Sequence, residues 1–91
     1  MALKWTSSAR LDLVRLHEFL HSVNAPAAVR VVRRLVAGMK RIPPYPHLGT
    51  RLTEFEPREV RRILVGDYEI RYEVTETDIF ILRIFHVRED R

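Results

Sequence analysis

Cysteine is absent from this 91-residue chain, and glycine and lysine are scarce. Without cysteine, neither disulfide bonds nor thiolate metal ligands can support the fold, which is typical of proteins from reducing compartments. The three glycines do not form a glycine-rich phosphate-binding loop. No apolar run is long enough to cross a membrane, and residues 1–5 lack the apolar core of a secretory signal. We therefore expect a cytoplasmic protein with no membrane partner.

Hydrophobic residues make up 46% of the chain, enough for one small core, so we expect a single domain over residues 1–91. Residues 1–50 carry eight basic and two acidic side chains, a net charge of +6, whereas residues 51–91 carry eight basic and ten acidic ones, a net charge of −2. A basic half favours an acidic protein or nucleic acid as partner, but a solvated arginine surface gives the same composition.

Three segments rich in β-branched and aromatic residues, 58–65, 68–74 and 79–86, predict antiparallel strands joined at Gly66-Asp67 and Glu76-Thr77. Counting outward from both turns assigns each side chain to one face of the sheet. One face then carries Ile63, Val65, Tyr68, Ile70, Tyr72, Val74, Ile79, Ile81 and Phe85, with Arg61 and Arg83 at its margins. The other, mixed face carries Arg62, Glu69, Arg71, Glu73 and His86 together with Leu64, Phe80, Leu82 and Ile84.

Two amphipathic helices precede these strands, over residues 8–23 and 25–41. The apolar stripe of the first is Ala9, Leu13, Leu16, Leu20 and Val23, and that of the second is Ala28, Val32, Leu35, Val36 and Met39. We expect an α+β fold in which an N-terminal αα-hairpin packs on the apolar face of a C-terminal antiparallel sheet, with residues 3–5 as a short edge strand. Residues 42–49 form a proline-rich connector, and residues 51–55 fit either a loop or a short strand.

His17 and His21 enclose the pattern His-Glu-x-x-His, in which two histidines one helical turn apart bind zinc and the glutamate acts as a base. A zinc protease also needs a third ligand and a substrate cleft, and the sequence around this pattern offers neither. We therefore expect two surface histidines, no metal and no cofactor.

The mixed sheet face holds the remaining candidates for chemistry. Arg62 and Arg71, opposed in the predicted register, are placed to hold an RNA phosphate, and His86 to move a proton. The same arginines fit equally well as cross-strand ion pairs with Glu69 and Glu73. The apolar residues among them indicate that a partner covers this face.

Several groups of residues occur in an order typical of one family. They are Trp5, Asp12-Leu13, Pro26-x-Ala28, the proline-glycine connector, Val-Gly-Asp-Tyr-x-Ile-x-Tyr at 65–72 and Ile-Leu-Arg-Ile-Phe-His-x-Arg-x-Asp at 81–90. Over almost the whole chain they resemble the RelE/ParE superfamily of toxins from type II toxin–antitoxin modules. The last group is the most specific and resembles the ParE branch.

The resemblance implies a RelE/ParE-like fold and a toxin that binds and inhibits DNA gyrase without being an enzyme. It also implies a cognate, ParD-like antitoxin that neutralises the toxin in a hetero-oligomeric complex. We expect the antitoxin to contact Leu64, Arg71, Phe80, Leu82, Ile84, Arg30, Arg34 and Arg41. The target-binding residues that we expect are Arg83, His86 and Arg88.

The alternative is the RelE branch, whose members cut messenger RNA in the ribosome. In that branch a basic residue usually follows the first tyrosine of the corresponding strand, where this chain has Glu69. The lysine-rich strand of that branch is also missing, because Lys4 and Lys40 are the only lysines. A nuclease would have to rely on Arg62, Arg71, His86 and Arg88.

Overall fold

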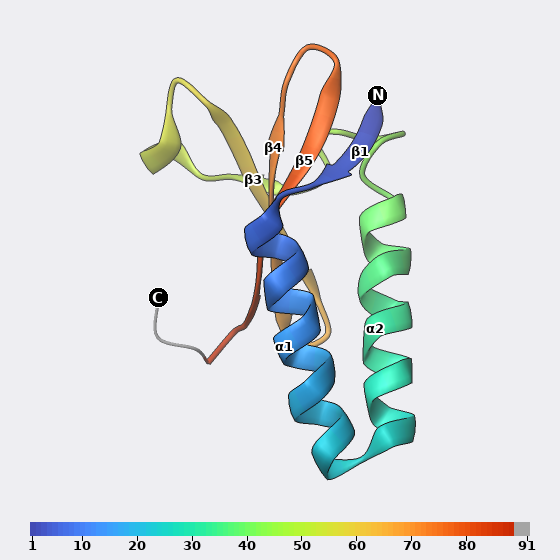
Figure 1. Ribbon diagram of the computed structural model, residues 1–91. Helices are drawn as coiled ribbons and strands as arrows, with labels where there is room; N and C mark the ends of the chain where they lie inside the picture. Colours follow the sequence, from blue (N-terminus) through green and yellow to red (C-terminus); the bar gives the residue numbers. More distant parts are fainter. Residues whose placement is uncertain (89–91) are drawn as a thin grey trace.

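The computed structural model describes residues 1–88, which form two helices packed on one face of a five-stranded sheet (Figure 1). The elements are β1 (Ala2–Trp5), α1 (Ser7–Val23), α2 (Ala25–Lys40), β2 (Thr50–Arg51), the 3-10 helix η1 (Thr53–Phe55), β3 (Glu59–Val65), β4 (Tyr68–Val74) and β5 (Asp78–His86). The strand order is β1-β5-β4-β3-β2. The predicted α+β fold and N-terminal edge strand are confirmed, and β1 makes the sheet mixed because it runs parallel to β5. Residues 51–55 hold both the end of a short strand and a helical turn.

Side-chain caps fix the helix boundaries within one residue of the prediction. Thr6 Oγ1 accepts a hydrogen bond from Ala9 N at 3.1 Å and starts α1. Asn24 donates its backbone N–H to Leu20 O at 2.7 Å and accepts from Ala27 N at 3.0 Å, so one residue both ends α1 and starts α2. The result is a tight antiparallel hairpin of helices, neither of which, within residues 1–88, is long and apolar enough to cross a bilayer.

The core lies between this hairpin and the sheet. Its fully buried side chains are Ala9, Leu35, Met39, Ile42, Ile70, Tyr72, Ile79 and Ile81, joined by Ile84. Val23, predicted to belong to the apolar stripe of α1, is instead 75% exposed. Figure 1 shows the reason, because the helices extend past the end of the sheet and the connection between them has no strand beneath it. The far half of the hairpin is therefore only partly covered.

The predicted register holds around both turns and then changes within β5. Val65 pairs with Tyr68 across Gly66-Asp67, and Tyr72 pairs with Ile81 as expected. The next pair is Arg71 with Arg83, so Leu82 is an extra residue that forms a β-bulge. Every residue after Leu82 consequently points to the opposite side from the prediction.

Four predicted placements are wrong for this reason. Ile84 and His86, expected on the mixed face, lie on the side of Ile70 and Tyr68, and Ile84 is buried in the core. Phe85, expected under the helices, lies on the mixed face beside Arg71. Arg83 follows Phe85 to that face at the edge of β5.

Residues at the start of α1 hold the bulge. The Thr6 hydroxyl lies 3.0 Å from the carbonyl oxygens of both Ile81 and Leu82 and donates to them. Asp12 Oδ2 accepts a hydrogen bond from the backbone N–H of Ile84 at 2.9 Å. These bonds tie the backbone on both sides of the bulge to the start of α1.

Candidate functional site

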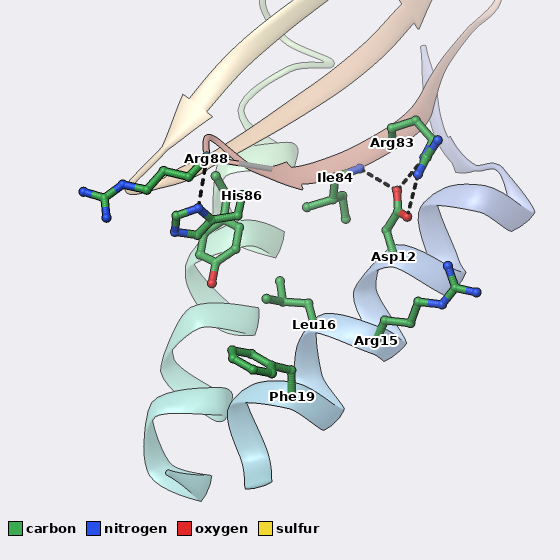
Figure 2. A pocket seen from close by; sticks show the side chains of 9 residues that line it. Asp12, Arg15, Leu16, Phe19, Arg83, Ile84, His86 and Arg88 are labelled. Carbon is green, nitrogen blue, oxygen red and sulfur yellow. Dashed lines mark hydrogen bonds and ion pairs between the residues drawn. The ribbon is translucent and has the colours of Figure 1, made fainter. Parts of the chain in front are cut away.

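A groove of about 440 Å³ lies between α1 and the end of β5. Its lining residues are Asp12, Arg15, Leu16, Phe19, Tyr68, Arg83, Ile84, His86 and Arg88. Figure 2 shows Leu16 and Phe19 pointing from α1 toward the end of β5, with the Arg88 guanidinium on one side and those of Arg15 and Arg83 on the other. The groove thus combines an apolar centre with a basic rim.

Asp12 fixes Arg83 at this rim. Arg83 Nε donates to Asp12 Oδ2 at 2.8 Å, and Nη2 donates to Oδ1 at 3.1 Å. The guanidinium also lies 5.0 Å from the centre of the Phe85 ring, where a cation and a ring face attract. Bidentate pairing restricts the arginine to one orientation. The Asp12 carboxylate, only 10% exposed, is already engaged by the protein.

His86 lines the groove because the bulge turns it toward α1. Its ring stacks edge-on against Tyr68, with 5.3 Å between the ring centres. Nδ1 accepts a hydrogen bond from the backbone N–H of Arg88 at 3.2 Å, which in the neutral ring places the proton on Nε2. The three predicted target-binding residues, Arg83, His86 and Arg88, therefore lie around one groove, although the Asp90 of their motif falls outside the described residues.

Sequence reasoning missed the helical side of the groove. This side consists of Arg15, Leu16 and Phe19 of α1. An arginine and a leucine are ordinary in an amphipathic helix, so their presence does not indicate a site. The available signal was Phe19, which is outside the predicted apolar stripe and is 66% exposed. An exposed aromatic beside a basic rim is typical of protein interfaces.

The mixed sheet face is organised around Glu69. Its side chain is fully buried and bridges Arg62 Nη1 at 3.2 Å and Arg71 Nη2 at 3.0 Å. The Arg71 guanidinium lies 5.4 Å from the Phe55 ring centre and 5.2 Å from that of Phe85. Both arginines thus form ion pairs with a buried carboxylate. This agrees with the predicted alternative in which they pair with Glu69 across the strands.

The predicted nuclease set is not brought together. Arg62 and Arg71 are paired on the mixed face, whereas His86 and Arg88 line the groove beside α1. Glu73 pairs with Arg58 at 2.7 Å, and the hydrogen bonds from that guanidinium lower the pKa of Glu73. Glu73 therefore forms no bridge to Arg62 or Arg71 within residues 1–88.

Of the eight predicted antitoxin contacts, Arg71 is paired with Glu69, and the other seven fall into three groups. Leu64 is 60% exposed, and Phe80 and Leu82 are half-buried, so they are accessible to a partner. Ile84 is not, because it belongs to the core. Arg30, Arg34 and Arg41 are exposed along α2, and Arg41 shares a hollow with Arg62 and Leu64. The arginine stripe of α2 therefore adjoins the edge of the mixed face.

His17 and His21 lie on the exposed part of α1 with their ring centres 5.6 Å apart. Within residues 1–88, no group of three or more histidine, cysteine, aspartate or glutamate side chains is arranged to hold a metal ion. Among these described residues, the two histidines have no third protein ligand of the kind that a zinc protease requires.

Comparison with known proteins gives the family. A family model described as the ParE toxin of the parDE type II toxin–antitoxin system matches residues 3–91. The chain belongs to the ParE toxin family. A solved chain of the chromosomal ParDE toxin–antitoxin system from P. aeruginosa is similar to this ParE-family protein, with a TM-score of 0.79 and 26% identity over 94% of this chain and 95% of that one. No curated protein matches the sequence.

Proposed function

We propose that this ParE-family toxin binds DNA gyrase and inhibits it, and that a cognate antitoxin neutralises it in a hetero-oligomeric complex. The observation that carries the choice of mechanism is the buried Glu69 between Arg62 and Arg71. It supports a protein that acts by binding, because it occupies the cations that an RNA-cutting site would need.

A ribonuclease of the alternative kind places an RNA phosphate, activates a 2′-hydroxyl and stabilises the developing charge, all within one site. A carboxylate about 4 Å from a phosphate costs on the order of 4 kcal/mol at a surface-like dielectric. Since Glu69 lies between the two arginines, it opposes phosphate binding there. His86, the candidate proton carrier, is on the opposite side of the sheet.

Inhibition of gyrase requires a surface complementary to the enzyme. We propose the groove beside α1 as this surface. Asp12 holds Arg83 in place there, and His86 and Arg88 line the same groove. We assign the gyrase contact to these three residues.

Two assays with the purified chain separate the mechanisms. We expect it to block gyrase supercoiling, or to trap cleaved DNA, while ribosome-bound messenger RNA stays intact. The variant Arg88→Ala should weaken inhibition of gyrase, whereas Arg33→Ala, on the exposed part of α2, should not. Codon-dependent cleavage of messenger RNA by the wild type, abolished by Arg71→Ala or His86→Ala, would falsify the proposal and establish the nuclease.

Hydrogen exchange tests the second part of the proposal, that an antitoxin binds this protein. We expect the antitoxin encoded by the adjacent open reading frame to protect β4, β5 or the helical hairpin, because the accessible apolar residues Leu64, Phe80 and Leu82 are flanked by arginines. Absence of protection in all of these elements would contradict the assignment.

A further inference from the structure

Helix α2 and the residue that caps its C-terminus carry basic side chains and no acidic one. The basic residues are Arg30, Arg33, Arg34, Lys40 and Arg41, and all of them are exposed. The buried residues of α2 include Ala28, Leu35 and Met39. Since successive residues are about 100° apart around a helix, the cations lie on the side of α2 opposite these buried residues. We call this set of five cations the α2 basic stripe.

The α2 basic stripe differs from the rest of the molecule because its cations have no acidic partners. None of them forms an ion pair within residues 1–88, whereas Arg61, Arg62 and Arg71 in the sheet each pair with a glutamate. Like charges three and four residues apart, such as Arg30 and Arg34, destabilise a helix. The fold itself therefore gives no reason for this cluster, and an anionic partner does.

The α2 basic stripe also lacks a large apolar side chain. The exposed position between Arg34 and Lys40 is Ala37, and Val29, which is 44% exposed, lies at the margin of the stripe. Protein interfaces are centred on buried aromatic or aliphatic anchors and are poor in lysine. Contacts with the phosphates of nucleic acid need only cations and hydrogen-bond donors. A row of phosphates therefore fits the stripe better than the surface of an acidic protein does.

The α2 basic stripe is long enough to meet several phosphates. At a rise of about 1.5 Å per residue, Arg30 and Arg41 are roughly 17 Å apart along the helix. Duplex DNA carries one phosphate charge per about 1.7 Å of its axis, so a duplex of this length presents about ten. Figure 1 shows α2 on the outer side of the hairpin, and no residue of α2 lines the groove beside α1. The stripe and the groove are therefore separate surfaces.

We infer that the α2 basic stripe binds the sugar–phosphate backbone of duplex DNA, whatever its base sequence. The choice of DNA among polyanions rests on the proposed function, because gyrase acts on DNA and the toxin would meet a duplex at its target. The binding itself needs no gyrase. The contact with the enzyme stays assigned to the groove beside α1, and α2 adds a second contact, with DNA.

Fluorescence anisotropy of a labelled duplex of about 20 base pairs, titrated with the purified chain at several salt concentrations, tests the inference. We expect a dissociation constant on the order of micromolar at low salt, and a slope of about −4 for the logarithm of the association constant against that of salt concentration. Arg30→Gln/Arg34→Gln should weaken binding more than tenfold and reduce the steepness of this slope by about two.

The matched control is Arg10→Gln/Arg15→Gln, which removes the same charge from exposed positions of α1. Its affinity for the duplex should stay within about threefold of the wild type, and duplexes of unrelated sequence should bind equally well. Thermal unfolding of both double variants shows whether the fold is retained.

Four results would overturn the inference. The wild type could fail to bind the duplex at low salt, or the α1 control could lose as much affinity as the stripe variant, which would make net charge the cause. Poly-L-glutamate could displace the duplex as well as unlabelled DNA does at equal charge, which would point to an acidic protein. An RNA duplex could bind more than tenfold tighter than DNA. Failure of the wild type to inhibit gyrase counts instead against the proposed function, because the anisotropy assay contains no gyrase.

Discussion

At the scale of single residues, the Tyr72 hydroxyl fastens the proline-rich connector to the sheet. It accepts a hydrogen bond from Gly49 N at 2.8 Å and donates one to Pro46 O at 2.9 Å. Gly49 is required here, because a Cβ atom would lie 2.5 Å from Arg62 O. The burial that protects these bonds also raises the pKa of Tyr72.

Tyr72→Phe should lower the free energy of unfolding by about 2 kcal/mol, since it leaves the buried Gly49 N–H without its partner. Urea denaturation measures the change. Tyr45→Phe is the control, because Tyr45 is 70% exposed, and it should leave the urea midpoint unchanged. Equal midpoints for Tyr72→Phe and the wild type would contradict this role of the hydroxyl.

Glu59 gives stability that depends on pH. Hydrogen bonds from Arg61 and His47 and the charge on Arg61 lower its pKa below the ordinary 4.5, against the opposing effect of burial. A carboxylate with a lowered folded-state pKa stabilises the fold above its unfolded-state pKa, and this contribution is lost as the pH falls through the folded-state pKa.

Glu59→Gln should therefore be about 1 kcal/mol less stable than the wild type at pH 7, and the difference should shrink as the pH falls through the lowered folded-state pKa of Glu59. Chemical denaturation over a series of pH values measures it. Glu54→Gln, in the exposed η1 turn, should show no such dependence. A gap for Glu59→Gln that persists at low pH would mean that packing, and not charge, causes it.

At the scale of secondary-structure elements, α2 approaches β3 through Gly38. A Cβ atom at Gly38 would lie 2.7 Å from Val65 Cγ2, too close for the two elements to keep their separation. Alanine improves helix propensity by about 1 kcal/mol, whereas overpacking costs about 1–3 kcal/mol. Gly38→Ala should thus be destabilising overall.

The double variant Gly38→Ala/Val65→Ala tests this cause. If the contact with Val65 causes the destabilisation, the two losses in the free energy of unfolding should not add. The loss in the double variant should be smaller than the sum of the losses in the two single variants by about 1 kcal/mol or more. Additive effects in urea denaturation would locate the strain elsewhere.

The histidine pair of α1 has no third metal ligand among the residues that the structure describes. Replacing both His17 and His21 by Gln should change neither the toxicity nor the metal content of the purified protein. Plasma emission spectrometry checks the metal. Stoichiometric zinc in the wild type, lost in the double variant, would show that the His-Glu-x-x-His pattern is a real site.

The order of elements, the helix boundaries and most of the register could be predicted from the sequence, because caps, turns and alternation are local signals. The bulge at Leu82 could not, because segment 79–86 is apolar on both faces and its alternation does not reveal an extra residue. A hydrogen bond donated by Thr6 and one accepted by Asp12, both far away in the sequence, help to determine it. Only the strand side of the groove could be predicted, because Arg83, His86 and Arg88 belong to a sequence motif. Phe19, on the helical side, reaches the groove through the packing of α1 against β5, which no local signal reveals.

At the scale of the whole molecule, the positive charge is concentrated in the helical half, with a net charge of +6 over residues 1–50. Arg30 on α2 and Arg41 at its C-terminal end are exposed and lie outside the groove beside α1. Long-range attraction of this kind raises the rate at which an acidic partner associates.

Arg30→Glu/Arg41→Glu should therefore slow association with the antitoxin about tenfold at low salt, with little change in dissociation, and the difference should shrink as salt is added. Stopped-flow or surface plasmon resonance kinetics at several ionic strengths measure both rates. A change confined to dissociation would mean that these arginines make direct contacts instead.

The pairing of β1 with β5 joins Ala2 to Asp78. During synthesis at about 5–20 residues per second, the nascent chain carries β1 for roughly 4–15 s before its partner strand is made. Thr6 and Asp12 are likewise synthesised long before the backbone groups of β5 with which they form hydrogen bonds. The groove that holds Arg83 and His86 therefore forms only after the ribosome has translated nearly all of the residues described here.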